Sequence, residues 1–199
     1  MIVNSTTKKQ DTKETLLEVG TQLILRDGFN HTGINEILML AGVPKGSFYY
    51  YFTSKEDFGL QVLAHFDQQN SATLRRFMDD HMMSPLERLR AYFVFNRDRL
   101  TDQGFTQGCL IGNMGQELSD QSEVFRVRLD DVMTRWESAI ADCLRESQAI
   151  GELSADRDVH ELAAFCLNSW QGAVLRMKVV KSTAPLESFI QLFFDHVIR

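Results

Sequence analysis

Hydrogen-bond donors and flat aromatic rings cluster in residues 41–57, which read AGVPKGSFYYYFTSKED. Lysine and serine side chains can reach base edges in the DNA major groove, while tyrosine hydroxyls and backbone amides can reach phosphates. A glycine among them lets the backbone approach a docked ligand closely. The candidate DNA contacts in this segment are Lys45, Gly46, Ser47, Tyr49, Tyr50, Tyr51 and Lys55. We therefore interpret the segment as a candidate surface for double-stranded DNA.

Two short helices joined by a tight turn are needed to present these donors. The apolar residues of the first helix recur at spacings of three and four: Ile34, Ile37, Leu38 and Ala41. Gly42 breaks this pattern, and Pro44 can open the second helix because its missing N–H is not needed there. Phe48 and Phe52 lie four residues apart, so they share one face and can anchor the second helix to the first. The donors are left on the opposite face.

A third helix is expected to begin near Thr53 or Ser54, either of which can act as its N-cap. Lys55 lies beside this helix N-terminus, where the lysine and the free amides together can bind a phosphate. A simpler interpretation stays open at this point. A small helical core can expose tyrosines without binding DNA, and helix-turn-helix patterns have many false positives.

The order of amino acids in residues 41–58 resembles the DNA-binding signature of the tetracycline-repressor (TetR) family. That signature is usually close to A-G-V-S-K-G-T-L-Y-Y-H-F-x-S-K-E-x-L. The resemblance implies that the donors named above lie at the DNA, with Lys55 on a phosphate. Gly33 stands where the family often has a serine or threonine, so one phosphate contact is lost or passes to Thr32. Tyr51 replaces a common histidine, which keeps a donor and lengthens its reach.

The composition is that of a globular chain. Its 199 residues, 44% of them hydrophobic, can bury a core as one or two domains. No apolar run of roughly 18 residues occurs, so we expect no membrane span, and the polar N-terminus does not resemble a secretory signal. Three widely spaced cysteines suit a reducing cytoplasm. The net charge is −6, and residues 1–60 hold six basic and seven acidic side chains, so any DNA surface must depend on how the charges are distributed.

The remaining elements are expected to be helices. Residues 1–10 resemble an arm, with Lys8 and Lys9 near a phosphate, or equally a solvated tail. Asp11 begins a capping box that starts the first helix, which ends at Gly28. A cap at residues 84–87 follows a long helix from residue 58, and residues 122–147 form an amphipathic helix with Val124 in its buried stripe. The last two helices, at 159–180 and 185–198, are apolar on more than one side, which is typical of deep burial or of contact with a partner.

Residues 104–115 hold four glycines with apolar side chains and a cysteine between them. Such a segment is typical of a loop that opens into a helix and lines a cavity. The sequence around Cys109 and Glu117 resembles a TetR subgroup that includes electrophile- and oxidant-responsive repressors, and Cys109 matches the position of the sensing cysteine in some of them. Cys109 is therefore a sensor, a pocket wall or simply a small buried hydrophobe. The candidate effector-site residues are Cys109, Asn113, Phe66, Trp136, Phe165 and Trp170.

We predict an all-α chain of about nine helices, with a DNA-binding head at residues 1–57 and an effector-binding and dimerisation body at 58–199. The resemblance implies a cytoplasmic, ligand-responsive regulator, more often a repressor, that binds a palindromic operator as a homodimer through its last two helices. The effector is an unknown small molecule or an electrophile. A helical enzyme is one alternative, but we find no catalytic residues, metal ligands or cofactor motif in the sequence. A ligand-binding or redox-sensing module that no longer binds DNA is another, disfavoured by the intact segment 41–57.

Overall fold

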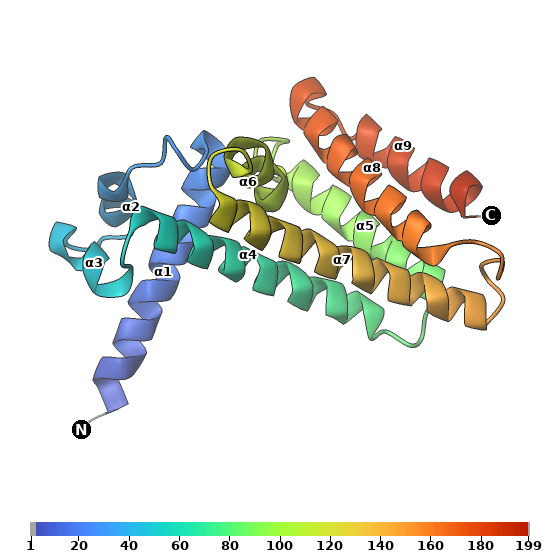
Figure 1. Cartoon of the computed structure of the whole chain (residues 1–199), viewed down its shortest axis with the longest axis horizontal. Coiled ribbons are helices and arrows are strands. Elements are labelled where there is room, and N and C mark those ends of the chain that lie inside the picture. The colour runs from blue at the N-terminus through green and yellow to red at the C-terminus, as the bar shows by residue number, and fades with distance from the viewer. Residues whose placement is uncertain (1–2, 199) are drawn as a thin grey trace.

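A computed structural model describes residues 3–198 of the chain, with side chains from Asp11 onward. Within that range the chain forms nine α-helices and no strand, as predicted (Figure 1). The α-helices are α1 Val3–Asp27, α2 Ile34–Leu40, α3 Phe48–Tyr51, α4 Lys55–Met78, α5 Pro85–Asp102, α6 Leu110–Leu118, α7 Glu123–Ala149, α8 Val159–Val180 and α9 Ala184–Leu192. A 3-10 turn, Lys45–Ser47, leads into α3, and a π-helical turn, Phe193–Val197, continues α9. None of the described helices is long and apolar enough to cross a membrane.

Helix α1 begins at Val3, so the prediction that Asp11 starts it is wrong. The Asp11 carbonyl accepts a hydrogen bond from Thr15 Oγ1 at 2.8 Å, inside a continuous helix. A capping motif marks a helix start only when the preceding residues leave the helical conformation, and no proline or glycine precedes Asp11 to cause that. The predicted contacts of Lys8 and Lys9 lie outside the described side chains. The C-terminal prediction is confirmed, because Gly28 ends the helix with φ +85°.

A cluster of phenylalanines holds the head together. Phe48, Phe52 and Phe58 are each at most 1% exposed, and their ring centroids lie 4.8 to 5.5 Å apart. Phe48 and Phe52 are buried on one face as predicted, and the ring contacts anchor them to Phe58 of the following long helix, whereas the prediction was that they anchor to the helix before. Phe58 belongs to α4, which runs unbroken from the Ser54 N-cap across the predicted boundary at residues 57 and 58. The core of the head thus includes the first turn of a long helix of the body.

Helix α7 lies at the centre of the body, where it contacts α4, α5, α6 and α8, while α9 packs on α8 (Figure 1). Its buried stripe runs through Phe125, Leu129, Val132 and Trp136. Val124 is 52% exposed, so its predicted place in this stripe is wrong. A residue adjacent to Phe125 is turned by about 100° around the helix, which directs Val124 towards solvent.

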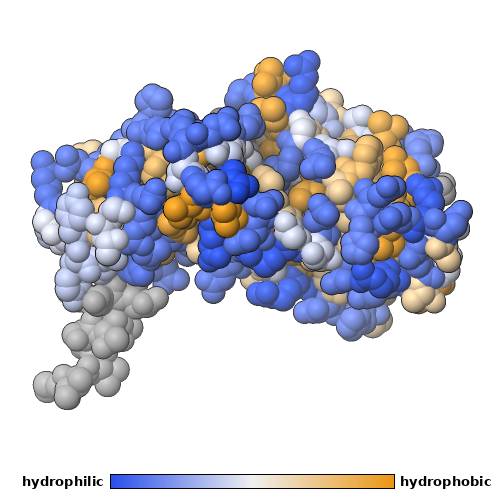
Figure 2. Space-filling model, viewed as in Figure 1, coloured by the Kyte–Doolittle hydropathy of each residue, from blue (hydrophilic) through white to orange (hydrophobic). Residues whose placement is uncertain are grey.

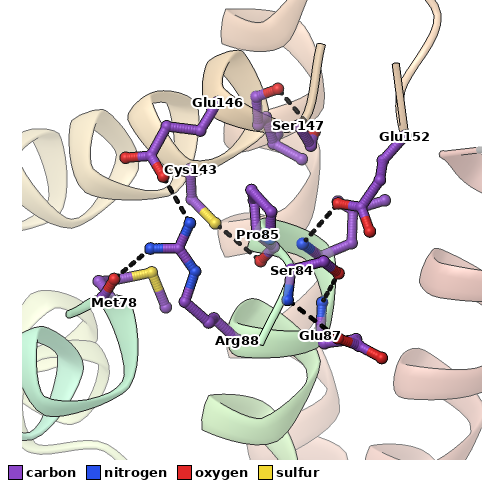
Figure 3. A network of polar contacts seen from close by, with 11 residues as sticks. Met78, Ser84, Pro85, Glu87, Arg88, Cys143, Glu146, Ser147 and Glu152 are labelled. Carbon is purple, nitrogen blue, oxygen red and sulfur yellow. Dashed lines mark hydrogen bonds and ion pairs between the residues drawn. The ribbon is translucent and has the colours of Figure 1, made fainter. Parts of the chain in front are cut away.

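Arg88 of α5 joins the end of α4 to α7 through a network of polar contacts (Figure 3). The side chain is 4% exposed, donates from Nη1 to the Met78 carbonyl, and pairs through Nη2 with Glu146 at 2.5 Å. Beside it, the Cys143 thiol donates to the Pro85 carbonyl at 3.1 Å. These contacts tie the end of α4 and the start of α5 to α7. The predicted cap of α5 is confirmed as a complete capping box.

Glu117, near the end of α6, docks the head onto the body. Its carboxylate accepts hydrogen bonds from the backbone amides of Phe29 and Asn30 at 2.8 and 2.7 Å. These amides follow the end of α1, where no helical carbonyl is available to them. The Phe29 ring also packs edge-on against Phe125 of α7, with 5.1 Å between centroids. One carboxylate and one aromatic pair therefore fix the turn between α1 and α2 against the body.

We expect Glu117→Ala to lower the free energy of unfolding by about 1–3 kcal/mol, because two backbone amides lose a charged acceptor. Urea unfolding followed by circular dichroism, at fixed protein concentration, measures the change. Gln116→Ala is the matched control, since Gln116 is the exposed preceding residue of α6. Equal stability of the two variants would contradict the docking role of Glu117.

Candidate DNA interface and effector cavity

The turn between α2 and α3 is closed by backbone geometry that the sequence requires. Gly42 has φ +66°, a left-handed conformation that glycine adopts without strain. The Val43 amide then donates to the Leu38 carbonyl at 2.9 Å, which closes the end of α2. Pro44 follows in the extended region, and its carbonyl accepts from the Ser47 amide at 2.9 Å. The second helix therefore starts as a 3-10 turn and becomes α-helical at Phe48.

The donors predicted to meet DNA lie on the outer side of this helix. Tyr49 is 69% and Tyr50 65% exposed, although Phe48 between them and the core is fully buried. Lys45 and Gly46 are exposed as well. The two remaining candidates of this helix, Ser47 and Tyr51, are half-buried, with the Tyr51 ring 5.1 Å from that of Tyr50 and edge-on to it. The structure therefore brings six of the predicted DNA-binding residues together on one short helix.

Three further candidates lie elsewhere in the head. Gly33 is exposed and caps α2 without a side-chain hydrogen bond, so amides in the first turn of α2 have no side-chain acceptor. Thr32 is 1% exposed and donates to the Gly28 carbonyl at 2.7 Å. Lys55 donates from Nζ to the Asn30 carbonyl at 3.0 Å, and burial lowers its pKa. Thr32 is thus engaged inside the protein, whereas Lys55 is half-buried at the surface and its ammonium is held by the Asn30 carbonyl.

A cavity of about 40 Å³, measured as the space open to the centre of a water molecule, lies inside the body. Helices α4, α5, α7 and α8 and the residues leading into α6 surround it. Its lining consists of Phe66, Asn70, Leu74, Tyr92, Phe93, Asn96, Arg99, Leu100, Gly108, Cys109, Trp136, Ile140, Leu167, Trp170, Gln171 and Val174. The glycine-rich segment contributes to the wall, as predicted for a loop that opens into a helix.

Four of the six effector candidates line this cavity: Phe66, Cys109, Trp136 and Trp170. The other two lie outside it. Asn113 donates from Nδ2 to the Gln107 carbonyl at 3.2 Å, which stabilises the loop before α6. Phe165 is 50% exposed on the outer face of α8, where its ring stacks on Phe193.

The polar part of the lining was missed in the sequence. Asn96 donates from its side chain to the Tyr92 carbonyl at 2.9 Å, and the Tyr92 hydroxyl contacts Asn70 Oδ1 at 3.3 Å. Burial raises the pKa of Tyr92 to about 12, so this hydroxyl stays protonated at neutral pH. Arg99 adds a guanidinium. The available signal was Asn96, a polar residue in register with the buried stripe of α5 that also holds Tyr92 and Leu100.

The three cysteines have different surroundings. Cys143 is buried and burial raises its pKa to about 12, while that of fully buried Cys166 is raised further still. Cys109 is half-buried at the cavity wall, where Gln171 Nε2 donates to its Sγ at 3.5 Å. Cys109 is therefore the most accessible thiol of the three. The thiolate is the reactive form of cysteine, so the buried Cys143 and Cys166, which stay protonated, are expected to be inert.

A stripe of apolar and small residues runs along the outer face of α8. Phe165, Leu175 and Val179 are 50%, 47% and 65% exposed, and Ser169 and Gly172 lie between them. Apart from the adjoining residues of its own helix, no described atom lies within 4 Å of the place where a Gly172 Cβ would be, so another helix can approach closely there. Figure 2 shows orange, apolar surface in the region where Figure 1 places α8 and α9. We refer to this face as the α8 stripe.

Known proteins match both the head and the body of this chain. Residues 16–62 match the family described as bacterial regulatory proteins, tetR family, and residues 85–193 match the tetracyclin repressor-like C-terminal domain. The transcriptional regulator AcuR of Cereibacter sphaeroides is 38% identical over 93% of this chain and 84% of that protein. The HTH-type transcriptional repressor DhaR of Mycobacterium sp. (strain GP1) is 38% identical over 94% of this chain and 92% of that protein.

A crystal structure of a regulatory protein TetR from Rhodobacter sphaeroides has the same fold. It superposes with a TM-score of 0.87 and is 39% identical, over 92% of this chain and 96% of that one. The helix-turn-helix, the cavity-bearing body and these matches along nearly the whole chain lead to one conclusion: the protein belongs to the tetR family of bacterial regulatory proteins.

Proposed function

We propose that this protein is a ligand-responsive repressor that binds operator DNA as a homodimer. The observation that carries the proposal is the exposed tyrosine and lysine surface of one short helix, backed by the fully buried Phe48. The rings of the two exposed tyrosines are hydrated at a cost in free energy, and a contact with DNA would remove them from water. The name of the similar DhaR protein, a transcriptional repressor, favours repression over activation.

In the proposed complex, α3 enters the major groove. Lys45 and Ser47 approach base edges, the three tyrosines contact phosphates, and the uncapped first turn of α2 beside Gly33 receives another phosphate. Thr32 supports this turn from inside. For Lys55 to contact a phosphate, its ammonium would have to leave the Asn30 carbonyl, so the structure favours a positioning role for this residue.

The α8 stripe supplies the proposed contact between two copies of the chain. Its exposed apolar residues recur over four turns of the helix, and small residues between them permit a partner helix to pack closely. Pairing through α8 and α9 would place both heads on the same side of the dimer. Two recognition helices then read half-sites about 34 Å apart, one turn of DNA.

Helix α6 provides a direct connection between the cavity and the head. Cys109 caps its first turn at the cavity wall, and Glu117 near its last turn holds the Phe29 and Asn30 amides. An effector that binds more tightly to one position of α6 shifts the population of head orientations by that difference in affinity. Release from DNA follows when the favoured orientation no longer matches the half-site spacing.

We expect Tyr49→Ala to weaken operator binding by about tenfold or more, because a hydrogen bond and a ring contact at the DNA are lost. The operator is first selected from a random pool of duplexes by the purified protein, and binding is then measured by fluorescence anisotropy. Met82→Ala is the control, since Met82 is 95% exposed at the opposite end of the molecule. Unchanged affinity in a Tyr49→Ala protein with normal helical circular dichroism would contradict the proposed docking.

We expect Leu175→Glu to raise the dimer dissociation constant at least about tenfold, because it places a charge in the middle of an apolar contact. Light scattering at micromolar concentration should give a dimer mass for the unmodified protein and a lower mass for the variant. Val127→Glu, at a 45% exposed valine of α7, is the control. A monomeric unmodified protein would refute dimerisation, and a dimeric Leu175→Glu protein would refute the α8 stripe as its interface.

The accessibility of Cys109 favours a repressor in which this thiol reacts with the effector. We expect N-ethylmaleimide to modify one thiol in the folded chain within minutes, and Cys109→Ser to abolish that modification in intact-mass measurements. If the thiol is the sensor, maleimide releases the operator from the unmodified protein and leaves the Cys109→Ser complex bound. Equal release from both proteins would show that Cys109 is a wall of the cavity and not a sensor.

A further inference from the structure

One polar atom at the cavity lacks a partner. Among the buried side-chain nitrogen and oxygen atoms of the described residues, those without a hydrogen bond are Nε of Arg88 and Nε of Arg99. Arg88 satisfies its other nitrogens through Met78 and Glu146, whereas no ion pair is found for Arg99 in the described part of the chain. A buried, unpaired donor on a charged group is costly, and such an exception calls for a ligand or another explanation.

The charge of the cavity is one-sided. No aspartate or glutamate lines it, so the Arg99 guanidinium has no acidic counterpart within the wall. The nearby polar groups, Tyr92, Asn70, Asn96 and Gln171, are neutral, and they contact one another, the backbone or Cys109. An anion with a single negative charge would therefore complete the cavity electrostatically.

The size and the walls of the cavity limit what that anion can be. A volume of about 40 Å³ is small, so the cavity favours a small ligand over a large one. The remaining wall is largely aromatic and aliphatic, with Phe66, Phe93, Trp136 and Trp170 among its members. A phosphate or sulfate would bring two charges against this apolar wall with one guanidinium to compensate them.

We propose that the cavity binds a short-chain aliphatic monocarboxylate, whose carboxylate accepts from Arg99 Nε and whose hydrocarbon part packs against the aromatic wall. This inference rests on the proposed function, because it names the chemical class of the effector. Arg99 distinguishes the acid from a neutral analogue of the same shape. The Tyr92 hydroxyl lies in the same polar part of the lining and donates to Asn70 Oδ1 at 3.3 Å, so it becomes a second donor to the ligand only if it turns away from Asn70.

Both tryptophans of the chain line the cavity, so their fluorescence reports binding without DNA. The titration uses acetate, propionate, butyrate and hexanoate, with propionamide, butyramide and inorganic phosphate as comparison ligands. We expect a saturable fluorescence change with at least one of the three- or four-carbon acids, and at least tenfold weaker binding of its amide and of phosphate. Arg99→Met should weaken binding of the acid about 10- to 100-fold.

Arg97→Met is the matched control, because Arg97 lies two residues earlier in α5 and pairs with Asp98 at 2.7 Å outside the cavity. It should bind the acid with unchanged affinity. The comparison of acid with amide on the unmodified protein decides the matter even if Arg99→Met fails to fold. Equal binding of acid and amide would overturn the proposal. So would the lack of a response to any acid up to about 10 mM, or full affinity in a folded Arg99→Met protein.

Operator binding is measured separately on the same preparations. If the protein selects an operator but none of the acids alters tryptophan fluorescence, the ligand class is wrong and the repressor function stands. If an acid binds through Arg99 but no duplex is enriched, the cavity assignment stands and the repressor function fails.

Discussion

One carboxylate that accepts hydrogen bonds from two backbone amides holds the head of this molecule in position on its body. Glu117 holds the amides of Phe29 and Asn30, and Gly28 leaves the room for it, because a Cβ at Gly28 would lie 3.0 Å from Glu117 Oε2. Asn30 is further held by its own side chain, which donates to Gln121 at 3.0 Å. The orientation of the helix-turn-helix therefore depends on the position of a helix whose other end borders the cavity.

The cavity is small, and two kinds of structure form its wall: long helices and one loop. Helices α4, α5, α7 and α8 supply most of its lining, whereas Gly108 and Cys109 come from the loop that leads into the short helix α6. Gly108 has φ +76°, and a Cβ there would lie 2.8 Å from the Lys178 side chain, so the loop runs close against α8. This part of the wall leads directly into α6, which carries Glu117 at its other end.

The parts of the fold that depend on local spacing were predictable from the sequence. Phe48 and Phe52 at four-residue spacing, the capping box at Ser84 and the glycine at the end of α1 each have one simple structural solution. Positions set by distant contacts were not predictable. Lys55 is held at the surface by the carbonyl of Asn30, 25 residues earlier, and Phe165 lies outside the cavity because α8 is rotated to bury Cys166 and Leu167. Arg99 was overlooked because a single charged residue in a helix is ordinarily solvated.

Helix α4 runs without a break from the core of the head to the wall of the cavity, so it connects the two directly. It carries Phe58 of the head core at its first turn, and Phe66, Asn70 and Leu74 of the cavity wall further along. Its 24 residues form a rod; at 1.5 Å per residue such a rod is about 36 Å long, and a tilt of about 5° moves one end by about 3 Å relative to the other. That displacement is comparable to the rise of one base pair. In the proposed function, a rigid helix of this length would turn a small movement beside the effector into a larger displacement of the head relative to the DNA.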